Sequence, residues 1–169
     1  MAALALGACD SGDPEGPGSM SILLTDAPGD VEQAIVTIDR IEIVGGSGGP
    51  RVLRDTPWTG DLTLLANEFV TLVDGYVLPQ GSYAQLRLVI SEACISVEAA
   101  EGPNEVYASA GTDLECDGTL TGDLQMPSFS QTGIKVIFQG AIAVDSDQTI
   151  VLLDFDVEES FGKLAGGCL

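Results

Sequence analysis

Apolar and polar residues alternate in short runs along most of this chain, which is the pattern of β-strands with one buried face. The alternation is clearest at residues 84–90, where Leu86, Leu88 and Ile90 share one face. Gln85 and Arg87 lie on the other face. Similar patterns predict strands at residues 21–26, 33–44, 134–138 and 149–157, and shorter candidates are residues 51–53, 69–72, 94–98 and 105–109.

The apolar face switches within residues 33–44, since Val36 and Ile38 lie on one side and Ile41 and Ile43 on the other. A bulge near Asp39 and Arg40 would reconcile the two halves. Segments rich in Gly and Pro predict turns at residues 45–50 and 78–83, and only residues 61–68 have the pattern of a short helix. Seven or eight antiparallel strands of this kind predict an all-β fold, a two-layer sandwich.

The first residues contain a candidate export signal. Leu6-Gly7-Ala8-Cys9 has the form of a bacterial lipoprotein processing site, in which the cysteine is lipidated and becomes the mature N-terminus. Only eight residues precede Cys9 and none is Lys or Arg. We therefore interpret them as the last part of a signal peptide, in a sequence whose start codon is assigned too far downstream. The alternative is an accidental match in a disordered tail. On the first reading, residues 1–19 are residual signal, processing site and flexible tether, and residues 20–169 are a single sandwich domain.

Charge narrows the choice of partners. The chain has 26 Asp and Glu against 6 Lys and Arg, a formal net charge of −20. Such a surface repels phosphate backbones, so we expect no nucleic-acid partner. No apolar stretch approaches the roughly 20 residues of a membrane span, so we expect membrane attachment through the lipid on Cys9, outside the cytoplasm.

Five ordered segments resemble one known family. They are residues 21–30, 36–42, 78–88, 127–135 and 153–160, which together extend over almost the whole domain. They are similar to the domain of unknown function 4382 family, whose members are bacterial or archaeal envelope proteins, often lipoproteins. The resemblance implies an immunoglobulin-like or prealbumin-like sandwich and brings no established activity.

Three cysteines remain if Cys9 carries lipid. We favour a disulfide between Cys94 and Cys116, because it would close the acidic, Gly-rich excursion between two strand regions. Closing a loop of about 20 residues stabilises a fold by roughly 3 kcal/mol. Cys168 could stay free, cross-link to another chain, or replace Cys94 as the partner of Cys116.

Paired carboxylates are the candidate chemistry. Asp154 and Asp156 project from one face of a predicted strand, and Asp26 and Asp30 flank a Pro-Gly turn, so the four could converge on a hard cation such as calcium. The alternative is structural. Asp154 or Asp156 would then pair with Arg87 or Arg40, or accept hydrogen bonds from backbone amides, because a partly buried carboxylate needs a partner. Asp145 and Asp147 are expected to be solvated turn residues.

Enzyme motifs occur and fail on inspection. Residues 45–49 match a Gly-x-Ser-x-Gly nucleophile motif, but the chain has no histidine to act as base. Residues 160–163 match Ser-x-x-Lys without the further motifs that accompany it. A glycosidase needs only two carboxylates, which this acidic chain could supply. We therefore expect no enzyme and keep a small carboxylate-dependent extracytoplasmic hydrolase as the alternative.

Aromatic residues offer a candidate ligand surface. Trp58 lies in a predicted loop and could stack against a sugar ring, with Tyr76 or Tyr107 as a second surface. The alternative is that Trp58 covers one end of the core. The sequence thus predicts a lipid-anchored, non-catalytic envelope module that binds a glycan, a cation or another envelope protein, or serves a structural role, with no cofactor unless calcium binds.

Overall fold

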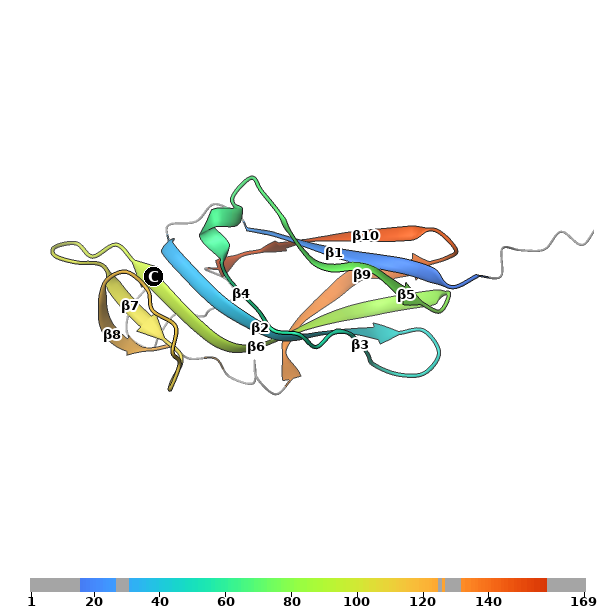
Figure 1. The fold of residues 1–169 in the computed structure, drawn as a ribbon, viewed down its shortest axis with the longest axis horizontal. Helices are drawn as coiled ribbons and strands as arrows, with labels where there is room; N and C mark the ends of the chain where they lie inside the picture. Colours follow the sequence, from blue (N-terminus) through green and yellow to red (C-terminus); the bar gives the residue numbers. More distant parts are fainter. Residues whose placement is uncertain (1–15, 27–30, 125, 127–131, 158–169) are drawn as a thin grey trace, which may run out of the picture.

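Two β-sheets pack face to face in this protein (Figure 1). The computed structural model describes residues 16–26, 31–124, 126 and 132–157. Within these residues the strands are β1 (Gly18–Asp26), β2 (Val31–Gly45), β3 (Arg51–Arg54), β4 (Trp58–Asp61), β5 (Val70–Leu78), β6 (Gly81–Val97), β7 (Glu105–Ala108), β8 (Thr119–Asp123), β9 (Ile134–Val144) and β10 (Gln148–Phe155). A short 3₁₀ helix, η1 (Leu62–Leu65), follows β4 and confirms the short helix predicted within residues 61–68.

The smaller sheet has the strand order β10-β1-β5. Its central strand β1 runs parallel to β10 and antiparallel to β5. Alternate residues Met20, Ile22 and Leu24 of β1 point into the sandwich and are fully buried. Val151, Leu153 and Phe155 of β10 are buried beside them, so the alternation in these segments predicts the inner face correctly.

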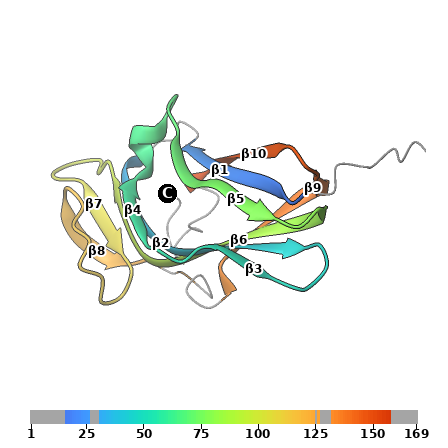
Figure 2. The ribbon, with the colours of Figure 1, turned by 45° about the vertical axis from the view of Figure 1, so that its right-hand side comes forward.

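The larger sheet has the order β3-β2-β6-β7-β8, with β4 on β2 and β9 on β6. Its centre is the long antiparallel pair β2–β6, whose inward side chains form most of the core opposite β1. β7 and β8 extend the larger sheet beside the end of β6, away from the three strands of the smaller sheet (Figure 2). The predicted all-β two-layer sandwich is therefore confirmed. The described residues form ten strands rather than the predicted seven or eight, and two of the strand pairs, β1–β10 and β7–β8, are parallel.

The predicted bulge at Asp39 is present, and a second one faces it. Ile38 pairs with Ile90 and Arg40 with Val89, so Asp39 is extra on β2. Thr37 pairs with Glu92, so Ser91 is extra on β6. The Ser91 hydroxyl donates a hydrogen bond to Asp39 Oδ1 at 2.8 Å. Both strands therefore switch their apolar face at the same place. The pairing register between β2 and β6 is the same before and after the two bulges.

This double bulge explains one wrong prediction. The sequence predicts separate strands at residues 84–90 and 94–98. They form the single strand β6, because the extra residue Ser91 changes the phase without ending the strand. β5 and β9 are longer than predicted, and β4 and β8 fall in segments whose sequence lacks alternation.

A disulfide joins Cys94 on β6 to Cys116, which precedes β8, with their Cα atoms 6.1 Å apart. The bond confirms the favoured pairing and ties the acidic excursion to the sandwich. Cys9 and Cys168 lie outside the described residues.

We expect that replacing both Cys94 and Cys116 by Ala lowers the free energy of unfolding by about 3 kcal/mol, because 22 residues separate the cysteines and the open chain gains loop entropy. The corresponding fall in Tm is roughly 6 to 12 °C. Thermal unfolding followed by circular dichroism measures it. A reducing agent should lower the Tm of the wild type and leave the double variant unchanged; equal Tm values for the two oxidised proteins would contradict the prediction.

Candidate functional site

Asp26 is a buried carboxylate without a hydrogen-bond partner for one of its oxygens. It is the last residue of β1 and continues the inward series of Ile22 and Leu24, with only 6% of its surface exposed. Its backbone forms an isolated bridge with Ala66, just after η1. Its Oδ1 is buried and accepts no hydrogen bond from the residues that the structure describes. This carboxyl group therefore loses hydration on folding without regaining it from the protein.

The surroundings of Asp26 are acidic. Burial, and then the negative charges of Asp154, Asp156 and Asp61, raise the pKa of Asp26 to about 6. Asp61 is already used: its Oδ1 caps η1 by accepting a hydrogen bond from Thr63 N at 3.1 Å, and it also accepts one from Ala34 N of β2 at 3.2 Å. The sequence predicts the neighbourhood of Asp26 with Asp154 and Asp156, and misses Asp61.

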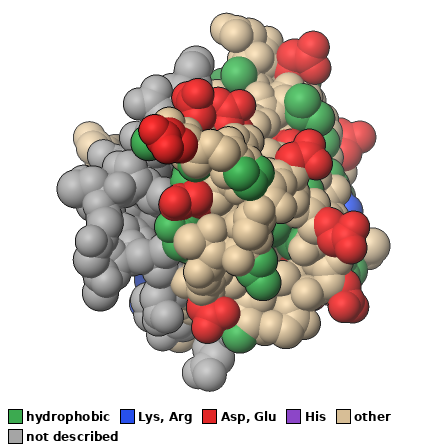
Figure 3. Space-filling model, turned by 90° about the vertical axis from the view of Figure 1, so that its left-hand side faces the viewer, with side chains coloured by type: hydrophobic (Ala, Val, Ile, Leu, Met, Phe, Trp, Pro, Cys, Tyr) green, Lys and Arg blue, Asp and Glu red, His purple; other side chains and the backbone are tan. Residues whose placement is uncertain are grey.

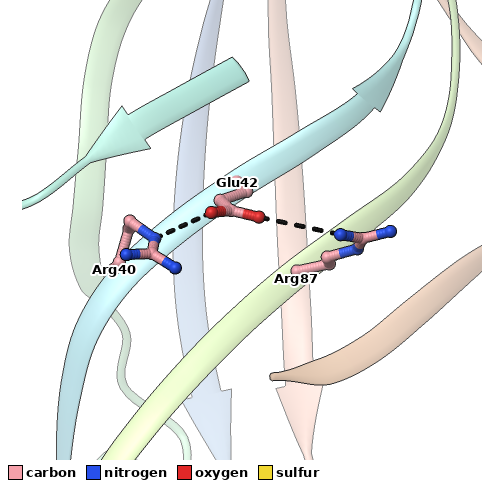
Figure 4. A network of polar contacts seen from close by, with 3 residues as sticks. All are labelled: Arg40, Glu42 and Arg87. Carbon is pink, nitrogen blue, oxygen red and sulfur yellow. Dashed lines mark ion pairs between the residues drawn. The ribbon is translucent and has the colours of Figure 1, made fainter. Parts of the chain in front are cut away.

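The arginines do not pair with these aspartates. Arg40 Nε lies 2.7 Å from Glu42 Oε1, and Arg87 Nη1 lies 3.9 Å from Glu42 Oε2 (Figure 4). Glu42 and Arg87 are cross-strand partners on the outer face of the larger sheet. Asp154 is exposed on the outer face of the smaller sheet. The predicted ion pairs are therefore wrong: both arginines pair with Glu42. The two sheets place the arginines and Asp154 on opposite surfaces of the molecule.

The described residues include only some of the carboxylates of the calcium hypothesis. Asp30 lies outside the described residues. The residues that are described contain no group of three or more His, Cys, Asp or Glu side chains that could hold a metal ion. Asp145 and Asp147 lie in the turn between β9 and β10, where the Asp145 carboxylate accepts a hydrogen bond from Asp147 N at 2.9 Å, as expected of turn residues.

A groove of about 540 Å³ opens between β9 and β10. Its floor is the inward face of β9 with Leu88 of β6, and its wall is β10. Asp154 is the single carboxylate among the described residues that line it. Leu88 is 1% exposed, whereas the β9 side chains are only partly buried against the core: Ile134, Val136, Phe138 and Ile142.

The groove follows from the unequal width of the two sheets. β9 and β10 are joined by a short turn but belong to different sheets, and each forms an edge among the described strands. No described strand lies beyond β10 to cover the inner face of β9. The sequence predicts β9 as core-facing and misses the groove. A usable signal is the unbroken apolar run Ile150-Val151-Leu152-Leu153, which is typical of a strand buried on both faces.

The aromatic residues do not form one platform. Trp58 is half-buried on β4 and packs against the core, with its ring so close to Gly60 that a Cβ there would collide with it. Tyr76 lies on β5 of the smaller sheet. Tyr107 lies on β7 at the far side of the larger sheet, and its hydroxyl donates to Glu105 Oε2 at 2.9 Å. The position of Trp58 favours the interpretation that it covers the core.

A second hollow of about 540 Å³ lies beside the disulfide. Its lining includes the exposed carboxylates of Glu115, Asp117 and Asp123. Figure 3 shows this end of the molecule, where Asp and Glu side chains are scattered over the surface and Lys or Arg is hardly visible. Of the Gly-rich residues 45–49, Gly45 ends β2 and residues 46–49 lie in the turn between β2 and β3, as expected; residues 160–163 lie outside the described residues.

We expect Asp26→Asn to stabilise the protein at pH 7. The native state holds the Asp26 proton up to about pH 6 and the unfolded chain only up to about 3.8, so this carboxyl's contribution to stability falls as pH rises between those values. The variant avoids the cost of ionisation. We expect a gain of about 1 kcal/mol at pH 7, reduced by solvent screening of the exposed Asp154 and Asp156.

Thermal unfolding at pH 7 and at pH 3.5 measures this effect. The gain in Tm, roughly 2 to 4 °C, should vanish at pH 3.5, where Asp26 is neutral in both states. Asp113→Asn, in an exposed loop, makes the same change in net charge and should shift Tm much less. An equal gain at both pH values would show that ionisation of Asp26 is not the cause.

Comparison with known proteins identifies the family. No curated protein and no solved structure matches the chain. Within the described part of the chain, none of the helices combines the length and the apolar character needed to cross a membrane. The model of the family described as a domain of unknown function (DUF4382) matches residues 17–168. Because this match covers nearly the whole chain, the protein belongs to the DUF4382 family.

Proposed function

We propose that this protein is a non-catalytic binding module of the bacterial cell envelope, held outside the cytoplasm by lipid on Cys9. Its ligand is contacted through the groove between β9 and β10. The observation that carries this proposal is the half-covered inner face of β9, where four apolar side chains of a core strand line an open groove. Leaving such side chains uncovered costs about 25 cal/mol per Å² of apolar area that a ligand could bury.

The volume and lining of this groove support a binding role. About 540 Å³ lies within the usual range for ligand sites, roughly 300 to 1,000 Å³, and the lining is mostly apolar with Thr149 and Asp154 as polar groups. An apolar segment of a ligand suits this surface better than a sugar, whose hydroxyls would lose hydrogen bonds to water in it.

The location rests on the sequence. Leu6-Gly7-Ala8-Cys9 and the polar, Gly-rich residues that follow it favour a lipid anchor joined to the domain by a tether. The net charge of −20 does not distinguish a position outside the cytoplasm from one inside it. It disfavours direct contact of the domain with anionic lipid headgroups.

The alternative function, a carboxylate-dependent hydrolase, is favoured by one observation. The hollow beside the disulfide brings Glu115, Asp117 and Asp123 to one place. A carboxyl group that acts as a general acid usually lies in a buried, apolar site, whereas these three carboxylates are exposed. We therefore favour binding. Hydrolysis of a panel of envelope glycans that is lost in Glu115→Gln would reverse this preference.

For the anchor, we expect the native protein from membrane extracts to begin at an acylated Cys9 in its mass spectrum. In the variant Cys9→Ser, the protein should leave the membrane fraction, because a serine cannot form the thioether. Cys168→Ser is the matched control and should stay in that fraction. An unmodified Cys9 in the membrane-extracted protein would refute the anchor.

For the groove, we expect the neutral apolar dye Nile red to fluoresce with the wild type and to lose at least about tenfold in affinity in Val136→Asp, because an unpaired charge then lines the groove. Ile137→Asp is the matched control. Ile137 is the next residue of β9, points outward and is 72% exposed, so this variant should bind as the wild type does. Equal binding by both variants would remove the groove from the proposal.

A further inference from the structure

The wall of the groove is β10, and over residues 149–154 one of its backbone edges pairs with no strand that the structure describes. β10 pairs with β1 along one edge, and the described residues supply no strand for the other. Backbone N–H and C=O groups on such an edge form a template for a further strand. A strand added here would be the fourth of the smaller sheet and would lie over the inner face of β9. Backbone pairing and groove filling would therefore be achieved by one extended segment.

The side chains of β10 support an added strand. Residues 150–153 are apolar without interruption, which is typical of a strand with a cover on both faces. Val151 and Leu153 face the core and are buried, whereas Ile150 and Leu152 on the outer face are 62% and 59% exposed. Leu23 of β1 registers with Leu152, so the apolar strip continues onto the neighbouring strand. An incoming segment with apolar residues on both faces would extend this strip and fill the groove.

The charges around β10 indicate which segment fits. Exposed carboxylates lie at both ends of β10: Asp145 and Asp147 in the turn before it, and Asp154, which also lines the groove, near its end. A second copy of this chain fits poorly, because each copy has a net charge of −20 and only 6 Lys and Arg. A segment with an apolar middle and basic ends is complementary along its whole length.

We propose that the groove between β9 and β10 binds an extended segment of another protein, apolar in its middle and carrying Lys or Arg at both ends, which adds to β10 as a further strand of the smaller sheet. This inference rests on the proposed binding function and specifies its ligand class. The segment spans residues 149–154 of β10, which at about 3.3 Å per residue corresponds to roughly 20 Å of extended chain.

The probe is a synthetic peptide of roughly nine residues, with valine at every central position, so that both faces are apolar, and two lysines at each end. Binding to the full chain is measured by isothermal titration calorimetry. Two control peptides carry a central proline, which removes a backbone donor, or glutamates in place of the lysines. We expect both controls to bind at least about tenfold more weakly than the lysine peptide.

Variants of the protein test the two parts of the site. Val136→Asp should weaken the lysine peptide at least about tenfold, and Ile137→Asp should not. Asp154→Lys changes only an exposed side chain, so it stays informative even if Val136→Asp fails to fold. It should weaken the lysine peptide and strengthen the glutamate peptide. Sedimentation of the wild type should show a monomer.

Several results would overturn the inference. Equal binding of the proline and lysine peptides would exclude strand addition, and an unchanged preference in Asp154→Lys would exclude the charge recognition. A wild-type dimer disrupted by Val136→Asp would make a second copy the occupant. If Nile red binds the wild type and no peptide does, the groove stays a ligand site and this ligand class is wrong. If neither binds, the proposed function fails as well.

Discussion

The fold depends on two facing bulges, Asp39 on β2 and Ser91 on β6, joined by a hydrogen bond of 2.8 Å. Each strand changes its apolar face at that point. A bulge on one strand alone would leave every later pair out of phase, so that half of the buried side chains of one strand would face water. Because both strands gain one residue, Ile41 and Ile43 beyond the bulge stay buried together with Leu86 and Leu88. The long pair can therefore curve and still supply one continuous core.

The groove is the consequence of covering this long pair with a narrow sheet. β1, flanked by β5 and β10, buries most of the inward faces of β2 and β6, and β9 lies beyond the reach of this cover. The partly exposed apolar side chains of β9 therefore lie on the same side of the molecule as the edge of β10 that no described strand pairs with. Two acidic residues have different environments. Asp26 lies at the end of β1 in a site that favours its protonated form, whereas Glu42 forms ion pairs with both nearby arginines.

Local patterns in the sequence predict those features of the fold that depend on residues close together along the chain. The faces of β1, β6 and β10, the bulge at Asp39 and the pairing of Cys94 with Cys116 are of this kind. The sequence does not predict which sheet a strand joins. The opposite placement of Arg87 and Asp154, the parallel pairing of β1 with β10 and the uncovered face of β9 all depend on that choice. β4 and β8 were missed because short edge strands need no alternation.

The parallel pairing of β1 with β10 has a mechanical consequence. The two strands lie side by side over a continuous register from Ser19–Gln148 to Asp26–Phe155. A domain held at its N-terminal end and gripped along β10 would carry tension through this pair. The pull would run lengthwise, so the bridging backbone bonds would share the load as a set and would have to rupture together. Such shear geometry would resist traction between the N-terminal end of β1 and a segment bound along β10.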